Sequence, residues 1–284
     1  MKFQGFVREN GQVGIRNHVV VMPGVICAEM AAKKIASECG AVFLANPIGC
    51  GLNPKDMTVM LDVLSGLLAN ANVYGVLVVG LGCEFLKEEH YRSAVWKKAK
   101  KPVQYVCIQE MGGLSKTIEE GKKHVCQMQK EADAVPRTEA DLSDLILGLE
   151  CGGSDPTSGF SSNTVLGLVT DEVIDAGGTA ILSETVECIG AEHILRQNGR
   201  TPEIGEQIYQ AILDWEQKRY EESGQDVRCG NPSPGNMAGG ITTLTEKSLG
   251  CIHKAGSRPF DGCFEYGQWI DKKGLYFVNA AASD

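Results

Sequence analysis

Short apolar segments alternate with longer amphipathic segments through the first half of this 284-residue chain, and this order constrains the fold more than any other feature. The apolar segments have the length and composition of strands and lie at residues 18–22, 41–45, 75–80 and 103–108. The amphipathic segments have helical spacing and lie at residues 26–39, 56–69, 88–100 and 114–133. Because strands that alternate with helices pair in parallel through right-handed crossovers, the first half predicts an α/β fold with a parallel sheet.

The second half repeats this pattern less regularly, after a polar segment at residues 132–143 that contains Pro136. The predicted strands lie at residues 145–149, 179–182 and 275–278. The predicted helices lie at residues 163–176, 202–222 and 243–251. We therefore predict two α/β domains, residues 1–135 and residues 136–284.

Charge and hydropathy argue against several classes of protein. The chain has 27 Lys and Arg against 36 Asp and Glu, a net charge of −9, whereas nucleic-acid-binding proteins present a basic face. The longest apolar run, residues 73–83, is shorter than the ~18 residues that a membrane helix needs. The N-terminus lacks the apolar segment of a secretion signal. We expect a cytoplasmic protein without nucleic-acid or membrane partners, its cysteines reduced.

Familiar cofactor motifs are absent. No two cysteines have the C-x-x-C spacing of a zinc ribbon or a thioredoxin-like site. There is no phosphate-binding lysine loop and no G-x-S-x-G nucleophile elbow. The segment at residues 80–85 begins like a dinucleotide-binding loop but lacks the third glycine. A flavodoxin-like nucleotide binder is therefore only weakly supported.

Thiols and carboxylates flanked by glycine follow most of the predicted strands. Ligands of parallel sheets bind at the carboxyl ends of the strands, and thiolates and carboxylates serve as metal ligands or proton-transfer groups. Any one of these cysteines could instead be a small apolar core residue, and glycine-rich loops are common in α/β proteins. As a set they predict a metal site, with the ligands drawn from Cys50, Cys83, Glu84, Glu150, Cys151 and Glu184.

Other segments supply candidate bases and substrate-binding groups. His193 is expected in the first turn of a helix near several carboxylates, and either it or Glu187 is a candidate base. His193 could equally be a solvated side chain. Arg16 could hold a carboxylate with two hydrogen bonds or pair with a surface acid. The Gly- and Pro-rich segment 230–240 is a candidate anion-binding loop, through Asn231, Ser233 and Asn236, or else an irregular linker.

Six motifs, in order along the chain, together resemble the altronate dehydratase and galactarate dehydratase family. This family also includes the large subunit of sulfolactate sulfo-lyase. The motifs are G-F-V-R-E-N-G with G-I-R-N (residues 5–17), V-V-G-L-G-C-E (78–84), L-E-C-G-G-S-D (149–155), G-G-T-A-I-L-S-E-T (177–185), G-A-E-H (190–193) and N-P-S-P-G-N (231–236).

The resemblance implies an α/β fold in which a Rossmann-like or flavodoxin-like parallel sheet is followed by a second α/β domain. It implies a divalent metal, Fe²⁺ first or a similar ion such as Mn²⁺. An iron–sulfur cluster on Cys50, Cys83 and Cys151 is a separate alternative that the cysteines themselves leave open. Family members often have or bind a small N-terminal domain and continue beyond the last motif. We therefore expect a second domain that is incomplete relative to the family, a small partner subunit and a homo-oligomer.

The implied activity is that of a hydro-lyase in carbohydrate metabolism. Water would leave a 2,3-dihydroxy sugar acid, altronate or galactarate, with metal assistance, and a 2-keto-3-deoxy acid would form. In this hypothesis His193 or Glu187 removes the proton at C2, while Arg16 and the loop at residues 231–236 hold the carboxylate. The alternatives are a sulfolactate sulfo-lyase large subunit and a truncated, non-catalytic binding or assembly subunit.

Overall fold

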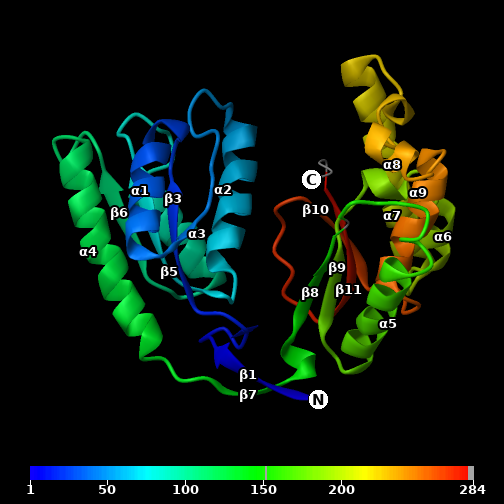
Figure 1. Cartoon of the computed structure of the whole chain (residues 1–284), viewed down its shortest axis with the longest axis horizontal. Helices are drawn as coiled ribbons and strands as arrows, with labels where there is room; N and C mark the ends of the chain where they lie inside the picture. Colours follow the sequence, from blue (N-terminus) through cyan, green and yellow to red (C-terminus); the bar gives the residue numbers. More distant parts are fainter. Residues whose placement is uncertain (151, 281–284) are drawn as a thin grey trace. The chain divides into compact units, whose positions relative to one another are not determined.

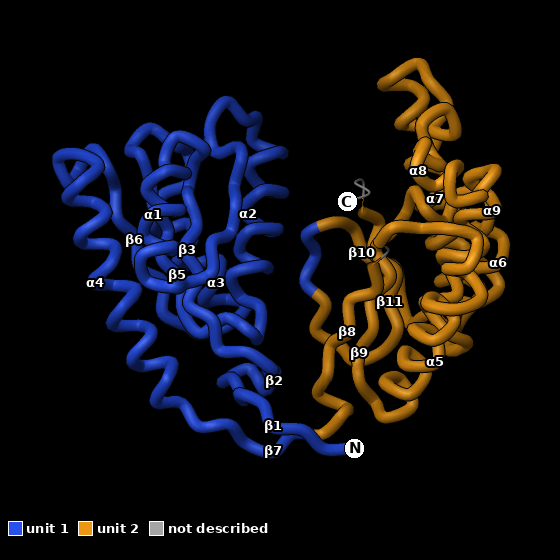
Figure 2. The backbone as a smooth tube through the Cα atoms, viewed as in Figure 1, with its two compact units in different colours: residues 1–140, 267–269 blue, residues 141–266, 270–284 orange. Residues whose placement is uncertain are grey.

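The computed structural model of this protein describes residues 1–150 and 152–280, which divide into two units (Figure 2). The first unit contains residues 1–140 and 267–269. The second contains the described residues of 141–266 and from 270 onward. No helix in the described part of the chain combines the length and apolar character needed to span a lipid bilayer.

Four parallel strands form the central sheet of the first unit, in the order β4-β3-β5-β6. They are β3 (His18–Pro23), β4 (Val42–Phe43), β5 (Val73–Gly80) and β6 (Val103–Cys107). All four were predicted from the apolar segments, although β4 is only two residues long. Each strand leads into the next through a helix, as the alternating pattern requires.

Helices cover both faces of this sheet (Figure 1). They are α1 (Glu29–Cys39), which follows η1 (Ile26–Ala28), and α2 (Pro54–Ala69), α3 (Glu88–Lys98) and α4 (Leu114–Asp133). Because side chains alternate along a strand, Val19 and Val21 pack with α1 and α4, while Val20 and Met22 pack with α2 and α3. This three-layer arrangement confirms the predicted Rossmann-like α/β fold.

A small second sheet of the first unit was not predicted. Its strands, in the order β2-β1-β7, are β1 (Lys2–Val7), β2 (Val13–Gly14) and β7 (Thr138–Asp141). In β7 only Ala140 is buried, so its sequence has the polar character of a linker. Backbone pairing with β1, rather than an apolar face, makes this segment a strand.

A buried lysine, Lys101, binds the backbone carbonyl groups at the end of α2. The Lys101 ammonium donates hydrogen bonds to the carbonyl oxygens of Ala69, Asn70 and Val73, at 3.0, 2.7 and 2.7 Å. The last carbonyls of a helix have no partner within the helix, so this side chain satisfies groups that would otherwise be buried unpaired.

We expect Lys101→Met to lower the free energy of unfolding by about 2 kcal/mol, because it leaves buried carbonyl oxygens without donors. Urea denaturation followed by circular dichroism measures the change. The neighbouring Lys100 is exposed, and Lys100→Met is the control, with an expected change below about 0.5 kcal/mol. Equal effects of the two substitutions would contradict this role of Lys101.

The second unit has its own parallel sheet, in the order β10-β11-β9-β8. The strands are β8 (Ile146–Leu149), β9 (Thr179–Leu182), β10 (Gly262–Glu265) and β11 (Gly274–Asn279). The longer helices are α5 (Ser162–Asp175), α6 (Glu192–Gln197), α7 (Pro202–Ser223) and α9 (Leu244–Cys251). Leu182 and Phe277 of the sheet pack in one core with Ile208 and Ile212 of α7. The second α/β fold is thus also present, and among the strands of this sheet β10, at its edge, was not predicted.

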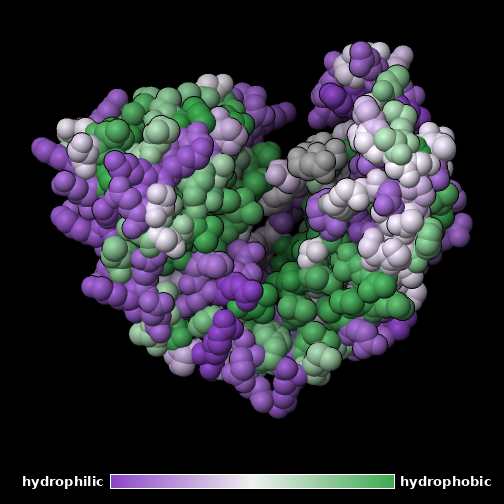
Figure 3. Space-filling view, in the orientation of Figure 1, coloured by the Kyte–Doolittle hydropathy of each residue, from purple (hydrophilic) through white to green (hydrophobic). Residues whose placement is uncertain are grey.

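An apolar patch marks the surface of the second unit over α5 and β8 (Figure 3). Along α5 it contains Val165, Leu168 and Val169, which are 60%, 63% and 45% exposed. Their spacing places them on one side of the helix, opposite the side that faces the core. Contiguous exposed apolar surface of this kind is typical of protein interfaces.

Candidate functional site

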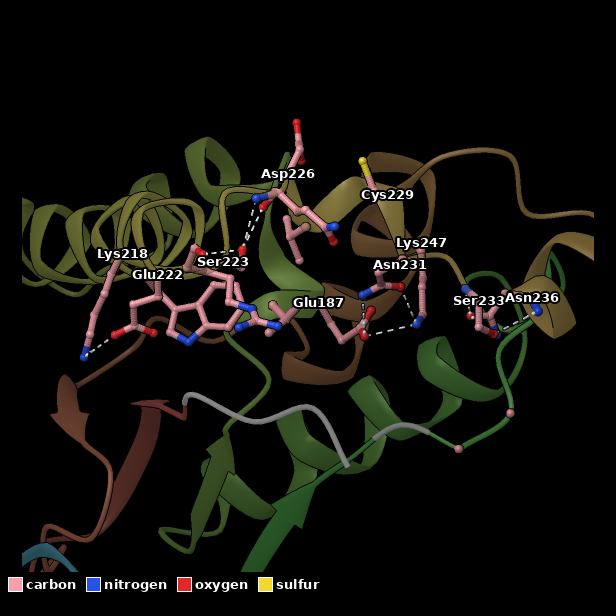
Figure 4. A pocket seen from close by; sticks show the side chains of 18 residues that line it. Glu187, Lys218, Glu222, Ser223, Asp226, Cys229, Asn231, Ser233, Asn236 and Lys247 are labelled. Atoms are coloured by element: carbon pink, nitrogen blue, oxygen red, sulfur yellow. Dashed lines mark hydrogen bonds and ion pairs between the residues drawn. The ribbon is translucent and has the colours of Figure 1, made fainter. Parts of the chain in front are cut away.

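A cavity of about 830 Å³ in the second unit lies beyond the carboxyl ends of β8 and β9 (Figure 4). Gly152 and Gly153 line it after β8, and Val186 and Glu187 line it after β9, within η3 (Val186–Cys188). The remaining wall comes from α7, η4 (Val227–Cys229), α8 (Pro234–Ala238) and α9. Parallel sheets commonly bind ligands at this end.

Glu187 has a buried carboxylate whose two oxygens differ. Oε1 accepts hydrogen bonds from Lys247 Nζ at 3.0 Å and from Asn231 Nδ2 at 3.1 Å. Oε2 is buried as well, and no hydrogen bond to it comes from the described residues. Glu187 as a whole is only 3% exposed. A buried carboxylate oxygen without a donor is unfavourable, so this atom is suited to a proton or hydroxyl of a bound molecule.

Lys247 and Asn231 complete a triangle with Glu187. Lys247 Nζ also donates to Asn231 Oδ1 at 3.0 Å, and Figure 4 shows the three side chains pointing toward one another. The Lys247 side chain is 11% exposed. The arrangement fixes one carboxylate oxygen and places an ammonium group beside it, so the site holds both a proton acceptor and a proton donor.

Lys247 is absent from the sequence-based set of candidates, although the sequence contains a signal for it. Leu244, Ser248 and Cys251 are buried on α9 at positions i, i+4 and i+7. Lys247, at i+3, shares that side of the helix. A lysine on the core-facing side of an amphipathic helix needs a partner, and here the partners are Glu187 and Asn231.

Ser233 and Asn236 also line the cavity, but their side chains bond to each other. Asn236 Oδ1 accepts hydrogen bonds from the backbone N–H and the hydroxyl of Ser233, both at 3.0 Å. Ser233 also accepts from the backbone N–H of Asn236, so the pair caps the short helix α8. Part of the segment predicted as an open loop is therefore helical, with Pro234 at the first helical position.

Three cationic side chains border the cavity, namely Lys218, Arg219 and Lys247. Lys218 lies 3.8 Å from Glu222, and Lys247 is paired with Glu187. Arg219 is exposed at the cavity wall. Glu187, Glu222 and Asp226 line the cavity as well, so its charge is mixed, and the guanidinium of Arg219 is the group best placed to meet a carboxylate.

Glu184 lies in the closed core of the second unit and is 2% exposed. Its carboxylate forms an ion pair with the fully buried ammonium of Lys254, and Cys251 Sγ lies 3.5 Å from Glu184 Oε2. A hydrogen bond with Cys188, together with burial, raises the pKa of the Cys251 thiol well above its usual value. Cys251 is therefore a neutral thiol, and Cys188 is buried beside it in the core.

The described residues do not form a complete metal site. Within residues 1–150 and 152–280, no three His, Cys, Asp or Glu side chains cluster closely enough to hold a metal ion. Glu150 and Glu184 follow the adjacent strands β8 and β9, whose last residues are in register, but the Glu184 carboxylate already faces Lys254. Cys151 lies outside the described residues.

The remaining candidate ligands lie in the first unit. Cys50 and Cys83 are exposed and follow β4 and β5, which flank β3. Glu84 is buried, and its oxygens accept hydrogen bonds from Tyr105 and from the backbone N–H groups of residues 81 and 82. Burial opposes ionisation of Glu84, but these hydrogen bonds, with a contribution from Lys87, hold its pKa below the usual value.

The last two predicted residues do not line the cavity. Arg16, in the first unit, is exposed and donates to the carbonyl oxygen of Ile15 at 3.1 Å. His193 lies in the first turn of α6, as predicted, and is exposed there. Of the predicted bases and substrate-binding residues, the structure brings four together at the cavity: Glu187, Asn231, Ser233 and Asn236.

Two family models match the chain. The model for the second domain of D-galactarate dehydratase/altronate hydrolase matches residues 5–133. The model for the C-terminal part of D-galactarate/altronate dehydratase matches residues 142–284. The chain is therefore similar to this group along both of its units.

Three curated proteins show how far this similarity extends. The altronate dehydratases of Bacillus subtilis (strain 168) and Escherichia coli (strain K12) are each 35% identical to the chain, over 293 and 292 residues. The (2R)-sulfolactate sulfo-lyase subunit beta of Chromohalobacter salexigens is 31% identical over 292 residues. Each match covers 99% of this chain, but 58% of either altronate dehydratase and 72% of the sulfo-lyase subunit. The chain thus spans little more than half the length of the first two relatives.

Proposed function

This chain belongs to the D-galactarate/altronate dehydratase family, and from that premise we propose that it eliminates water from a 2,3-dihydroxy sugar acid of the altronate or galactarate type. The product is a 2-keto-3-deoxy acid. The observation that carries the proposal is Glu187, a buried carboxylate at the cavity wall with one oxygen held and the other unpartnered among the described residues.

In the proposed reaction Glu187 Oε2 takes the proton at C2 of the sugar acid. The electron pair of the C2–H bond first moves into the substrate carboxylate as an ene-diolate. It then forms the C2=C3 double bond as the hydroxyl at C3 leaves with a proton as water. Lys247 is the acid nearest to Glu187, 3.0 Å from its other oxygen, and we assign it the proton that the leaving hydroxyl receives. The resulting enol then becomes the 2-keto acid, and the Glu187 proton restores the ammonium of Lys247.

We assign binding of the substrate carboxylate to the cationic side chains at the cavity, Arg219 first. Arg219 and Lys218 lie on the α7 side of the cavity, and Lys247 projects from α9. An anion among these groups gains charge-assisted hydrogen bonds in a partly enclosed space. Developing negative charge on the substrate during removal of the C2 proton is stabilised by the same cations.

The proposal also includes a metal cofactor. Fe²⁺ is the preferred candidate, and Mn²⁺ or an iron–sulfur cluster is the alternative. When bound, it would stabilise charge on the substrate as a Lewis acid. Since the described residues lack a complete ligand set, the steps above rest on this chain's own side chains.

We expect Glu150→Gln to lower the iron content several-fold, because an amide replaces a carboxylate at the end of β8. The measurement is elemental analysis by mass spectrometry after anaerobic loading with iron and removal of the excess. Glu172→Gln, an exposed position on α5, is the control and is expected to leave the iron content unchanged. An unchanged iron content in Glu150→Gln would remove this residue from the candidate ligands.

The activity is tested with the purified chain, anaerobic and loaded with iron, on D-altronate, galactarate and sulfolactate. The proposal expects a 2-keto-3-deoxy acid from one of the sugar acids. It also expects exchange of the C2 proton with D₂O solvent, which reports the first step even when elimination is slow. Neither product nor exchange with any of the three compounds would overturn it.

A sulfo-lyase is the second candidate, because the chain covers a larger share of the sulfolactate sulfo-lyase subunit than of the altronate dehydratases. The same base and acid would then release sulfite, and the assay would yield pyruvate and sulfite from sulfolactate. A non-catalytic binding subunit is distinguished by a substrate-induced rise in Tm without exchange or product.

We also propose two kinds of protein partner for this chain, a small partner subunit and further copies of the chain itself. The relative from Chromohalobacter salexigens is named as a subunit, so we propose a small partner subunit for this chain as well. The apolar side of α5 supports a homo-oligomer, because it exposes Val165, Leu168 and Val169. Light scattering coupled to size-exclusion chromatography gives the mass of the assembly, and a monomeric mass across the accessible concentration range would contradict a homo-oligomer.

A further inference from the structure

Two cysteines of the first unit form an accessible thiol pair. Cys39, the last residue of α1, and Cys126 of α4 are 87 positions apart in the sequence, but their sulfur atoms are 3.8 Å apart. Cys126 is exposed and Cys39 is half-buried. Both are free thiols, and neither has a role in the proposed reaction.

The backbone on either side of this pair is held in place. Helices α1 and α4 lie next to each other on the same face of the sheet (Figure 1). Gln129 Nε2 donates to the carbonyl oxygen of Cys39 at 2.8 Å, and Lys122 forms an ion pair with Glu38 at 2.5 Å. A disulfide needs a sulfur–sulfur distance of about 2.05 Å, so the two sulfur atoms, now 3.8 Å apart, must approach each other between helices that these contacts hold.

We propose that Cys39 and Cys126 are an oxidation site that closes to a disulfide between α1 and α4 when the protein meets hydrogen peroxide. Peroxide first oxidises Cys126 to a sulfenic acid and releases water. Cys39 then attacks the Cys126 sulfur, the sulfur–sulfur bond forms, and the sulfenic oxygen leaves as a second water molecule. The two thiols together lose two electrons and two protons, which reduce one peroxide to two waters, and a dithiol reductant reverses the change.

The order of the two steps follows from the surroundings of each thiol. Cys126 is the exposed sulfur, so peroxide reaches it first. Burial, together with the hydrogen bond to Cys126, raises the pKa of Cys39 to about 11. Since the thiolate is the attacking form, we expect closure of the disulfide to become faster as the pH rises toward that value.

The other described cysteines provide internal comparisons. Cys188 and Cys251 are also neighbours, but both are buried in the core of the second unit and out of reach of peroxide. Cys27 is also exposed, and it lies in η1, outside the contact between α1 and α4. Oxidation is therefore expected to join Cys39 to Cys126 and no other pair.

The test treats the folded, fully reduced chain with a small excess of hydrogen peroxide and then alkylates all remaining thiols in denaturant. We expect a peptide that joins Cys39 to Cys126, a whole-chain mass with two fewer hydrogen atoms before alkylation, and reversal by dithiothreitol. Cys39→Ser is expected to abolish the joined peptide and to leave Cys126 as a sulfenic acid that dimedone traps. The matched control, Cys27→Ser, is expected to form the joined peptide at the wild-type rate.

Circular dichroism before oxidation establishes that each variant is folded. A joined peptide between any other two cysteines, or overoxidation of Cys126 with Cys39 still free, would overturn the proposal. The outcome does not depend on the dehydratase activity, because the readout is covalent and both sulfurs lie in the first unit.

Discussion

Glu187→Gln is expected to lower kcat by about 10²–10⁴-fold, the usual range for loss of a general base. The substitution keeps the size of the side chain and a hydrogen-bond acceptor for Lys247, so the local fold is preserved. It removes the lone pair on Oε2 that would take the C2 proton, and it places an amide where a carboxylate is unpartnered among the described residues. Exchange of the C2 proton with D₂O should fall by the same factor as turnover.

The control for this experiment is Glu206→Gln. Glu206 is exposed on α7 and pairs with Arg196 at 2.6 Å, away from the residues that line the cavity. It should leave kcat and KM close to those of the unchanged chain. If Glu187→Gln retained both turnover and exchange, Glu187 would not be the base, and His193, the other predicted candidate, would be examined by the same measurements.

The second large effect is on stability and concerns the buried ion pair of Glu184 and Lys254. Lys254→Met leaves a carboxylate in the core without its ammonium partner, and such changes destabilise proteins by about 3–5 kcal/mol. We therefore expect the Tm of the second unit to fall by roughly 10 °C, measured by differential scanning calorimetry.

A double replacement separates loss of charge balance from loss of packing. When Glu184→Leu is added to Lys254→Met, the core contains no unpaired charge, and most of the lost stability should return. A double variant that is less stable than Lys254→Met would contradict this explanation. That result would mean that other contacts of Glu184 and Lys254, rather than the balance of their charges, stabilise this core.

Regular elements with a strong local pattern were predicted closely. Helix α4 and strand β9 have the bounds that the sequence pattern indicates. Their periodicity is a local property, set by which side chains face the core along one continuous segment. Strands β1, β2, β7 and β10 were missed. β2 and β7 have only two and four residues, and all four belong to a sheet through backbone pairing with other segments, which local periodicity does not show.

In the candidate site, too, the sequence predicted some of the residues and missed others. Glu187 and Asn231 were selected because polar groups that follow strands, and loops rich in Gly and Pro, often bind ligands. Lys247 was not selected, although its ammonium contacts both of them. Glu84 and Glu184 were selected as metal ligands for their position after a strand, but the structure engages their carboxylates with donors inside each unit.

The amino-acid sequence by itself determined the alternation of strands and helices, the two parallel sheets and the family resemblance, since these depend on spacing along the chain. Only the tertiary structure decided which side chains share the cavity. Lys247 meets Glu187 across 60 positions and Asn231 across 16, and Asn231 meets Glu187 across 44. No spacing rule connects such residues, because their distances depend on how the helices pack against the sheet, and that packing also decides which buried charges find partners.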